Sequence, residues 1–236
     1  MFNRTITKEL EAWKNKVGRK PLIMLGARQV GKTSVLKKFG KEQFEHCVYF
    51  SLDEEQGVCD IFRATKNPVQ IIEQLSFLTE EPILPQKTLL ILDEIQDCPE
   101  AISAMKYFCE KTPEYVVACA GSLLGLAFGH EGFSFPVGKV DHINMYPVTF
   151  SEFLEQRDAA LYRYYQSINS LEPLPQVFFD RLSQAFTAYR VSGGMPEAAM
   201  RMIDKDINGV EKTLQNILQD YALDFVKHAS PLLANR

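Results

Sequence analysis

The chain has 236 residues, a formal net charge of −4, 46% hydrophobic residues and 24% charged residues. These values are typical of a folded globular protein, and they exclude a largely disordered chain, a collagen-like rod and a coiled-coil rod. The longest uncharged stretch, residues 115–129, is shorter than the roughly 20 apolar residues that a membrane-spanning helix needs. The N-terminus shows no apolar signal segment, so we expect neither a membrane span nor secretion.

The five cysteines are scattered and the four histidines are isolated, which predicts no disulfide framework and no zinc site and favours a cytoplasmic location. Charge is unevenly distributed: residues 1–41 hold eleven Lys and Arg against two Glu. This basic excess is either a solvated helix or a local positive field where an anion binds. An overall acidic chain gives little support for bulk nucleic-acid binding.

Apolar spacing predicts the elements of the first part of the chain in order. Residues 4–17 are predicted as an amphipathic helix, with Ile6, Leu10, Trp13 and Val17 on one face. Short apolar runs predict buried strands over 21–25, 48–52, 88–92, 115–119 and 142–145. Helices are predicted over 32–39, where Gly40 ends the helix, and from Asn67-Pro68 and Pro99 onward, with Ile71, Ile72, Leu75 and Leu78 on one face of the former. This alternation predicts a parallel sheet with helices on both faces.

After residue 145 only helical patterns remain. Thr149 to Glu152 form a capping box that begins a helix, and further helices are predicted over 158–168, 176–190, 196–204 and 207–228. On the last helix, Ile207, Val210, Leu214, Ile217, Leu218, Tyr221 and Phe225 are predicted to line one face. We therefore expect an α/β domain over 1–145, a helical lid over 146–228 and a tail over 229–236.

Residues 26–33 match the phosphate-loop pattern G-x-x-x-x-G-K-[ST]. The glycines allow the backbone to wrap closely around phosphate, Lys32 supplies a cation, and the Thr33 hydroxyl is suited to Mg²⁺. Because the loop follows a buried strand and begins a helix, we favour a nucleotide site over an ordinary glycine-rich turn. The candidate nucleotide-binding residues are Gly26, Ala27, Arg28, Gln29, Val30, Gly31, Lys32, Thr33 and Ser34.

Two other strands end in residues suited to the same chemistry. Asp93 and Glu94 follow the apolar run 89–92, and ligands bind at the carboxyl ends of parallel strands. Asp93 is the candidate magnesium ligand with Thr33, and Glu94 is the candidate base that activates water. Ser122 ends the next strand, where it either senses the γ-phosphate or simply forms a turn.

These elements resemble AAA-type P-loop ATPases. They are most similar to bacterial and archaeal ATPases whose AAA-like domain precedes a C-terminal domain of unknown function. The resembling segments are 20–33, 92–96 with a Walker B motif and a trailing Gln, 121–125, 133–139, 146–153 and 192–196. The resemblance implies ATP as the nucleotide, a strand between the phosphate-loop strand and the Walker B strand, and a helical lid.

The chain departs from that family pattern in two respects. No arginine finger is assignable, and Arg157, Arg181, Arg190 and Arg201 are equal candidates for a lid arginine. Residues 221–227 resemble the start of the family's C-terminal domain, often described as restriction-nuclease-like. Any catalytic residues of that domain would lie beyond Arg236.

Together these features predict Mg²⁺-dependent hydrolysis of ATP to ADP and phosphate, which drives a conformational change between the sheet domain and the lid. The alternative is a nucleotide-gated module with little hydrolysis, which binds protein or DNA through the lid or the missing domain. A P-loop kinase fits least. Three further segments are interpreted as a turn at Gly193-Gly194, a solvated acidic loop at 53–55 and a loop near the nucleotide at 128–135.

Overall fold

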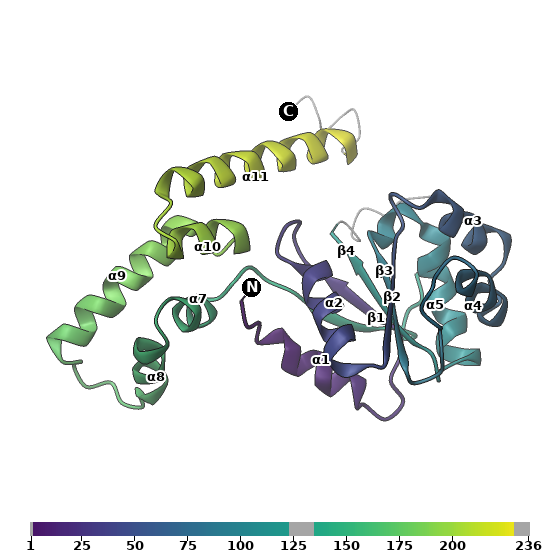
Figure 1. Cartoon of the computed structure of the whole chain (residues 1–236), viewed down its shortest axis with the longest axis horizontal. Helices are drawn as coiled ribbons and strands as arrows, with labels where there is room; N and C mark the ends of the chain where they lie inside the picture. The colour runs from purple at the N-terminus through teal and green to yellow at the C-terminus, as the bar shows by residue number, and fades with distance from the viewer. Residues whose placement is uncertain (1, 123–134, 229–236) are drawn as a thin grey trace. The chain divides into compact units, whose positions relative to one another are not determined.

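The computed structural model describes residues 2–122 and 135–228, so the tail and almost all of the 128–135 loop lie outside the described residues (Figure 1). The chain divides into two compact units. The sheet unit runs from Ile6 to Met145, and the helical unit comprises the chain from Tyr146 onward together with the residues up to Thr5. Within the described ranges, no helix has the length and apolar character needed to cross a membrane.

The sheet unit is built on five parallel strands in the order β2-β3-β4-β1-β5. Their bounds are β1 Leu22–Leu25, β2 His46–Ser51, β3 Thr88–Asp93, β4 Val116–Gly121 and β5 Asp141–Asn144. Every residue of β3 and β4 is buried, as expected for central strands covered on both faces. The predicted parallel sheet is confirmed, and β4 lies between β1 and β3 as the family resemblance implied.

Helices cover both faces of this sheet (Figure 1). Helices α1 (Ile6–Lys14) and α2 (Lys32–Gln43) lie on one face. Helices α3 (Gln56–Ala64), α4 (Pro68–Ser76) and α5 (Pro99–Lys111) share the largest apolar core with β2, β3 and β4. The short 3₁₀ helix η1 (Ile95–Asp97) connects β3 to α5.

Some predicted boundaries of the sheet unit are wrong. Helix α1 ends at Lys14 rather than at residue 17, and Val17 is 99% exposed, because the chain turns at Gly18 with φ 70°. Gly40 does not end α2, which continues to Gln43. Leu78 lies beyond the end of α4 and is exposed, so it is not part of the buried face. Helix α3 was not predicted.

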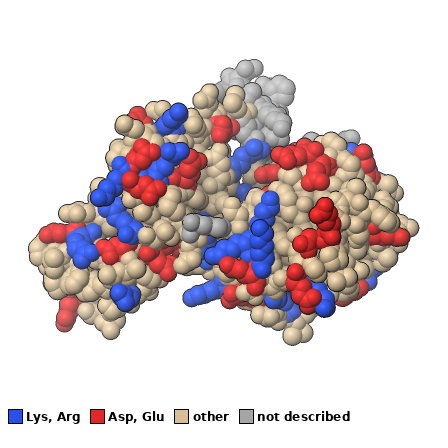
Figure 2. All heavy atoms as spheres, in the orientation of Figure 1, with Lys and Arg blue, Asp and Glu red and all other residues tan. Residues whose placement is uncertain are grey.

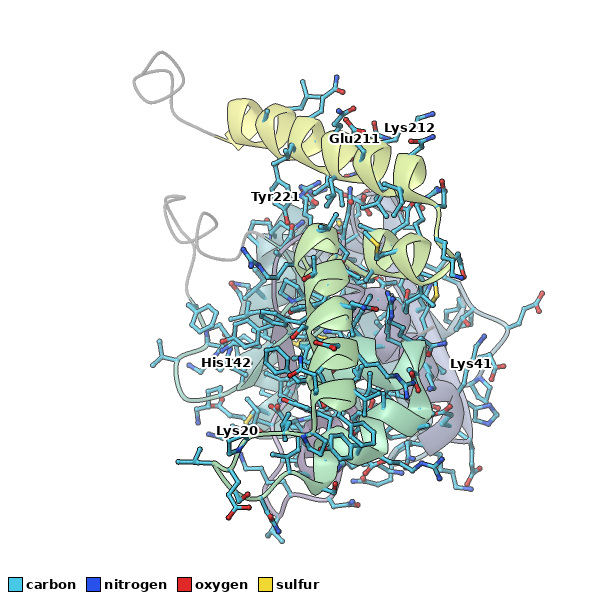
Figure 3. The ribbon with its side chains drawn as sticks, turned by 90° about the vertical axis from the view of Figure 1, so that its left-hand side faces the viewer. Lys20, Lys41, His142, Glu211, Lys212 and Tyr221 are labelled. Atoms are coloured by element: carbon cyan, nitrogen blue, oxygen red, sulfur yellow. The ribbon has the colours of Figure 1, made fainter. Side chains whose placement is uncertain are left out.

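The helical unit contains α7 (Phe150–Arg157), α8 (Ala159–Ser167), α9 (Gln176–Ser192), α10 (Pro196–Ile203) and α11 (Ile207–His228). The capping box between Thr149 and Glu152 is present, and Gly193 ends α9 with φ 63°, so both predicted signals are confirmed. Figure 3 shows Glu211 and Lys212 on the outer side of α11.

The predicted buried face of α11 is only partly correct. Val210 and Ile217 are buried, but Ile207 and Leu218 are 58% and 70% exposed. The buried stripe of this helix is therefore narrower than the apolar spacing predicts. The side chain of Phe225 lies outside the described part of the chain.

The first residues of the chain pack into the helical unit. Phe2 is 4% exposed and belongs to the apolar cluster that contains Val148 and Phe153. The backbone N–H and the hydroxyl of Thr5 donate to Glu152 Oε1 at 2.7 and 2.8 Å, and Arg4 Nε lies 3.2 Å from Glu152 Oε2. We call residues 2–5 the N-terminal strap. The helical unit is thus formed from two separate stretches of sequence.

Candidate functional site

The loop between β1 and α2 has the backbone that a close wrap around an anion requires. Gln29 and Gly31 adopt left-handed conformations, with φ 61° and 94°. The Lys32 ammonium lies across the loop and donates to the carbonyls of Gly26 at 2.9 Å and Ala27 at 2.8 Å. Lys32 therefore stands at the amino end of α2, where the helix dipole adds to its positive charge.

Gly26 is required by packing as well as by the loop. The N–H of Met145 donates to the Leu25 carbonyl at 2.7 Å, which brings the end of the sheet unit against the loop. A Cβ atom at Gly26 would lie only 2.3 Å from the Met145 carbonyl oxygen. The Met145 side chain also reaches within 3.7 Å of the Cβ position of Gly31. Met145, the last residue before the helical unit, therefore packs against both Gly26 and Gly31.

Burial sets the charge properties of Lys32. The residue is 6% exposed, and burial lowers its pKa below the ordinary value, while the carboxylates of Glu94 and Asp93 oppose this shift. A desolvated ammonium interacts more strongly with an anion than one in bulk water. Figure 2 shows Lys and Arg side chains gathered over α2, so the positive field extends along the helix.

Asp93 is the centre of a hydrogen-bond network at the carboxyl end of β3. It is 3% exposed, and its Oδ2 accepts from the Thr33 hydroxyl at 2.5 Å and from the Tyr49 hydroxyl at 3.2 Å. Its Oδ1 accepts from the Glu94 N–H at 3.0 Å. The Lys37 ammonium lies 3.2 Å from the centroid of the Tyr49 ring. Both proposed metal ligands are thus in direct contact.

Glu94 follows in a strained backbone conformation, with φ 47° and ψ 46°. Such conformations are uncommon for residues other than Gly and cluster at functional sites. The amide nitrogen of Gln96 donates to Glu94 Oε2 at 2.5 Å and to Asp97 Oδ2 at 3.2 Å. The candidate base is therefore held by a neighbouring amide.

Ser122 and Ser34 complete the predicted set. Gly121 is opposite Leu25 in the β1–β4 register, so Ser122 follows at the edge where the phosphate loop begins. Its Oγ is buried and forms no hydrogen bond with any residue in 2–122 or 135–228. Ser34 is exposed in the first turn of α2.

Sequence reasoning missed two residues of the site, Tyr49 and Gln96. Tyr49 is in a predicted strand, but its contact with Asp93 depends on the register in which Ser51 is opposite Asp93. Gln96 was noted only as a feature of the family pattern. Its contact with Glu94 depends on the 3₁₀ turn of η1, which the apolar spacing of the sequence does not indicate.

Three of the four candidate lid arginines have partners within the helical unit, and the fourth, Arg190, is exposed in the last turn of α9. Arg181 forms an ion pair with Asp158 at 2.5 Å, Arg201 pairs with Glu197 and Asp206, and the guanidinium of Arg157 lies 5.9 Å from the centroid of the Phe153 ring. In the 53–55 loop, Ser51 binds Asp53 and Glu55, and among the described residues no group of three potential ligands is suited to a metal.

The family described as AAA domain matches residues 18–154. No curated protein matches the chain.

Several solved structures are similar, but only distantly. The Thermotoga maritima RuvB Holliday junction branch migration motor has 14% identity and a TM-score of 0.47, covering 95% of this chain and 76% of that chain. The replication initiator DnaA bound to AMPPCP and single-stranded DNA has 15% identity and a TM-score of 0.46, covering 96% and 68%. C. elegans PCH-2 has 12% identity and a TM-score of 0.45, covering 91% and 70%.

The family match spans more than half of the chain and includes the loop at 26–33, Asp93, Glu94 and all five strands. The arrangement of that loop, the two carboxylates and the strand order agrees with it. This chain therefore belongs to the AAA domain family.

Proposed function

We propose that the chain binds ATP with Mg²⁺ and hydrolyses it to ADP and phosphate, and that hydrolysis changes the relation between the sheet unit and the helical unit. The observation that carries this proposal is the contact of Thr33 with Asp93 beside the phosphate loop. It places a hydroxyl and a carboxylate next to the ammonium of Lys32. The loop backbone from Gly26 to Ser34 and the Lys32 ammonium would hold the phosphates.

The donor set fits magnesium. Mg²⁺ prefers oxygen ligands and is usually held by one or two protein groups plus phosphate and water. Thr33 and Asp93 present a hydroxyl and a carboxylate at one point, and Tyr49 and the Glu94 N–H hold the carboxylate in place. When bound, Mg²⁺ would neutralise charge that develops on the phosphates.

Glu94 is the proposed base. It follows the proposed metal-binding carboxylate by one residue, and its backbone adopts a left-handed conformation that is uncommon outside functional sites. A carboxylate there would orient water and accept its proton. Ser122, whose Oγ is buried at the same edge, would contact the γ-phosphate.

Met145 is the proposed route of coupling. It contacts both glycines of the phosphate loop and directly precedes Tyr146, where the helical unit begins. A loop that shifts with the state of the nucleotide would displace the Met145 backbone. We also propose that a protein or DNA partner binds through the helical lid over 146–228 or a further C-terminal domain. A cytoplasmic location is proposed from the five scattered cysteines.

The contact between Gln96 and Glu94 favours one alternative, a nucleotide-gated module with little hydrolysis. The Gln96 amide donates a hydrogen bond to a carboxylate oxygen of Glu94 and so competes with water for that oxygen. In that case ATP would bind and the chain alone would turn over little.

Steady-state phosphate release from Mg-ATP, with Glu94→Gln beside the unchanged chain, separates these functions. We expect Glu94→Gln to retain ATP binding and to lose turnover by roughly 100-fold or more. Equal turnover in both proteins would contradict the role of Glu94. Bound ATP without turnover in either would support the gated module, and a phosphorylated acceptor instead of free phosphate would indicate a kinase.

A further inference from the structure

Two groups of basic residues in the 1–41 segment lie at opposite ends of the sheet. Arg28 and Lys32 belong to the phosphate loop, at the carboxyl end of β1. Lys14, Lys16 and Arg19 lie between the last turn of α1 and the start of β1, at the amino ends of the strands (Figure 1). The nucleotide site uses only the first group, so the second needs its own explanation.

The second group lines a cavity of about 410 Å³ within the sheet unit. One wall is formed by Lys14, Lys16, Gly18 and Arg19, and the other by Gln86, Pro113 and Glu114, which precede β3 and β4. This volume lies within the range of roughly 300–1,000 Å³ that is usual for small-molecule sites. We call it the Arg19 pocket.

Arg19 is half-buried and pairs only with neutral groups. Its guanidinium donates to the Lys14 carbonyl at 3.1 Å and to Gln86 Oε1 at 3.3 Å, and it lies 5.7 Å from the centroid of the Trp13 ring. Within the described ranges it forms no ion pair, and burial lowers its pKa. A desolvated cation without a countercharge is costly, and a bound anion would offset that cost.

The rest of the lining adds positive charge. The Lys14 ammonium donates to the Gln43 carbonyl at 2.5 Å, another neutral partner, while Lys16 pairs with Asp141 and remains half-exposed. Glu114 is the single acidic residue of the lining. Gly18 turns with φ 70°, and a Cβ there would have no neighbour within 4 Å, so the backbone is open to a ligand on this side.

We propose that the Arg19 pocket binds the phosphate group of a small phosphorylated molecule. A guanidinium fork matches two phosphate oxygens, and a nearby ammonium adds a second charge that suits a dianion better than a single carboxylate. The site is separate from the nucleotide site, because the two lie at opposite ends of parallel strands. Its occupancy therefore does not depend on the proposed ATPase activity.

The probe is inorganic pyrophosphate, titrated by calorimetry into the full chain whose nucleotide site is saturated with a non-hydrolysable ATP analogue. We expect one further site, weakened about 10-fold or more by Arg19→Gln and about 3-fold by Lys16→Gln, since each substitution removes one charge. The matched control Lys66→Gln, an exposed lysine between α3 and α4, should leave the affinity unchanged. Thermal unfolding verifies that each variant is folded, and Lys16→Gln tests the proposal if Arg19→Gln does not fold.

Absence of a second site in the saturated protein, or a second site that Arg19→Gln and Lys16→Gln leave unchanged, would overturn the proposal. A short single-stranded oligonucleotide identifies the source of the phosphate. If the oligonucleotide binds, requires Arg19 and is displaced by pyrophosphate, the pocket accepts a phosphate of nucleic acid as well. If the oligonucleotide does not compete, the ligand is a free phosphorylated molecule.

Discussion

Tyr49 connects the basic face of α2 to the proposed metal site. Its ring lies under the Lys37 ammonium and its hydroxyl donates to Asp93, the same oxygen that accepts from Thr33. The hydroxyl thus fixes one orientation of a buried carboxylate. Residues that orient a metal ligand typically change metal affinity when they are removed.

We predict that Tyr49→Phe raises the Mg²⁺ concentration needed for half-maximal nucleotide binding about 10-fold, because a hydrogen bond to a charged group is lost. A fluorescent ATP analogue titrated with Mg²⁺ measures this without turnover. The matched control is Tyr107→Phe on α5, whose ring lies near Lys106 and Lys111 instead. An unchanged Mg²⁺ requirement would show that Thr33 and the Glu94 N–H suffice to hold Asp93.

At the scale of single residues, the sequence predicted those candidate site residues that belong to a short motif or end an apolar run. Lys32 and Thr33 belong to one short pattern, and Asp93 ends an apolar run. The contacts of Tyr49 and Gln96 depend on strand register and on a 3₁₀ turn, and neither leaves a periodic signal in the sequence.

Gly40 shows how packing between elements overrides a local signal. Helices often end at Gly, but here Gly40 lies inside α2, where a Cβ would approach the Cys47 Sγ of β2 to 2.3 Å. The glycine therefore permits α2 to lie close to the sheet. Helix α3 was not predicted because its local signals are weak. The side chain of Glu55, its N-cap residue, forms no capping hydrogen bond, and Gly57 weakens the helical pattern.

Substitution by Ala is predicted to have opposite effects on stability at Gly57 and at Gly40. Gly57→Ala in α3 should stabilise the chain by up to about 1 kcal/mol, because Ala favours the helix and its Cβ meets no atom within 4 Å. Gly40→Ala should destabilise it by about 1–3 kcal/mol through overpacking. Urea unfolding followed by the fluorescence of Trp13, the single tryptophan, measures both. Stabilisation by Gly40→Ala would contradict the close packing of α2 on β2.

Glu152 joins the start of α7 to the N-terminal strap. Burial alone would raise its pKa, but N–H donors from Thr149 and Thr5 and the charge of Arg4 hold the pKa below its ordinary value. A carboxyl group with a lowered pKa stabilises the fold at pH values above its unfolded pKa, about 4.3. That stabilisation is lost as the pH falls through the folded value.

Glu152→Gln should therefore destabilise the helical unit by roughly 3 kcal/mol at neutral pH, because the neutral amide cannot form the buried ion pair that Glu152 makes with Arg4. The difference from the unchanged chain should shrink as the pH falls below about 4. Chemical denaturation at several pH values, followed by circular dichroism, measures this, with Glu172→Gln in the exposed loop before α9 as the control. A pH-independent difference would assign the loss to packing rather than to charge.

At the scale of the whole molecule, the helical unit contains residues that come before the sheet unit in the sequence as well as residues that come after it. The sequence predicted a change of character near residue 145, but it gave no sign that residues 2–5 pack with the later helices. Four residues are too few for a periodic pattern. The contact between Thr5 and Glu152 joins positions separated by 147 residues, and such pairs are visible only in the folded chain.

We predict that Phe2→Ala destabilises the helical unit by about 3–5 kcal/mol while the sheet unit is little affected, because the side chain fills a cluster within the helical unit. Circular dichroism should show an earlier transition of the helices, while the fluorescence of Trp13 in α1 keeps its midpoint. If both signals shift together, the two units unfold as one.

The N-terminal strap makes the sheet unit an insertion in the chain of the helical unit. A fragment that begins at Tyr146 would leave Glu152 without Thr5 and Arg4, and would leave the pocket of Phe2 empty. A synthetic peptide of residues 1–5, added in trans, would have to supply the missing piece. Removal of residues 1–5 would therefore weaken the helical unit even though the chain from Tyr146 onward is intact.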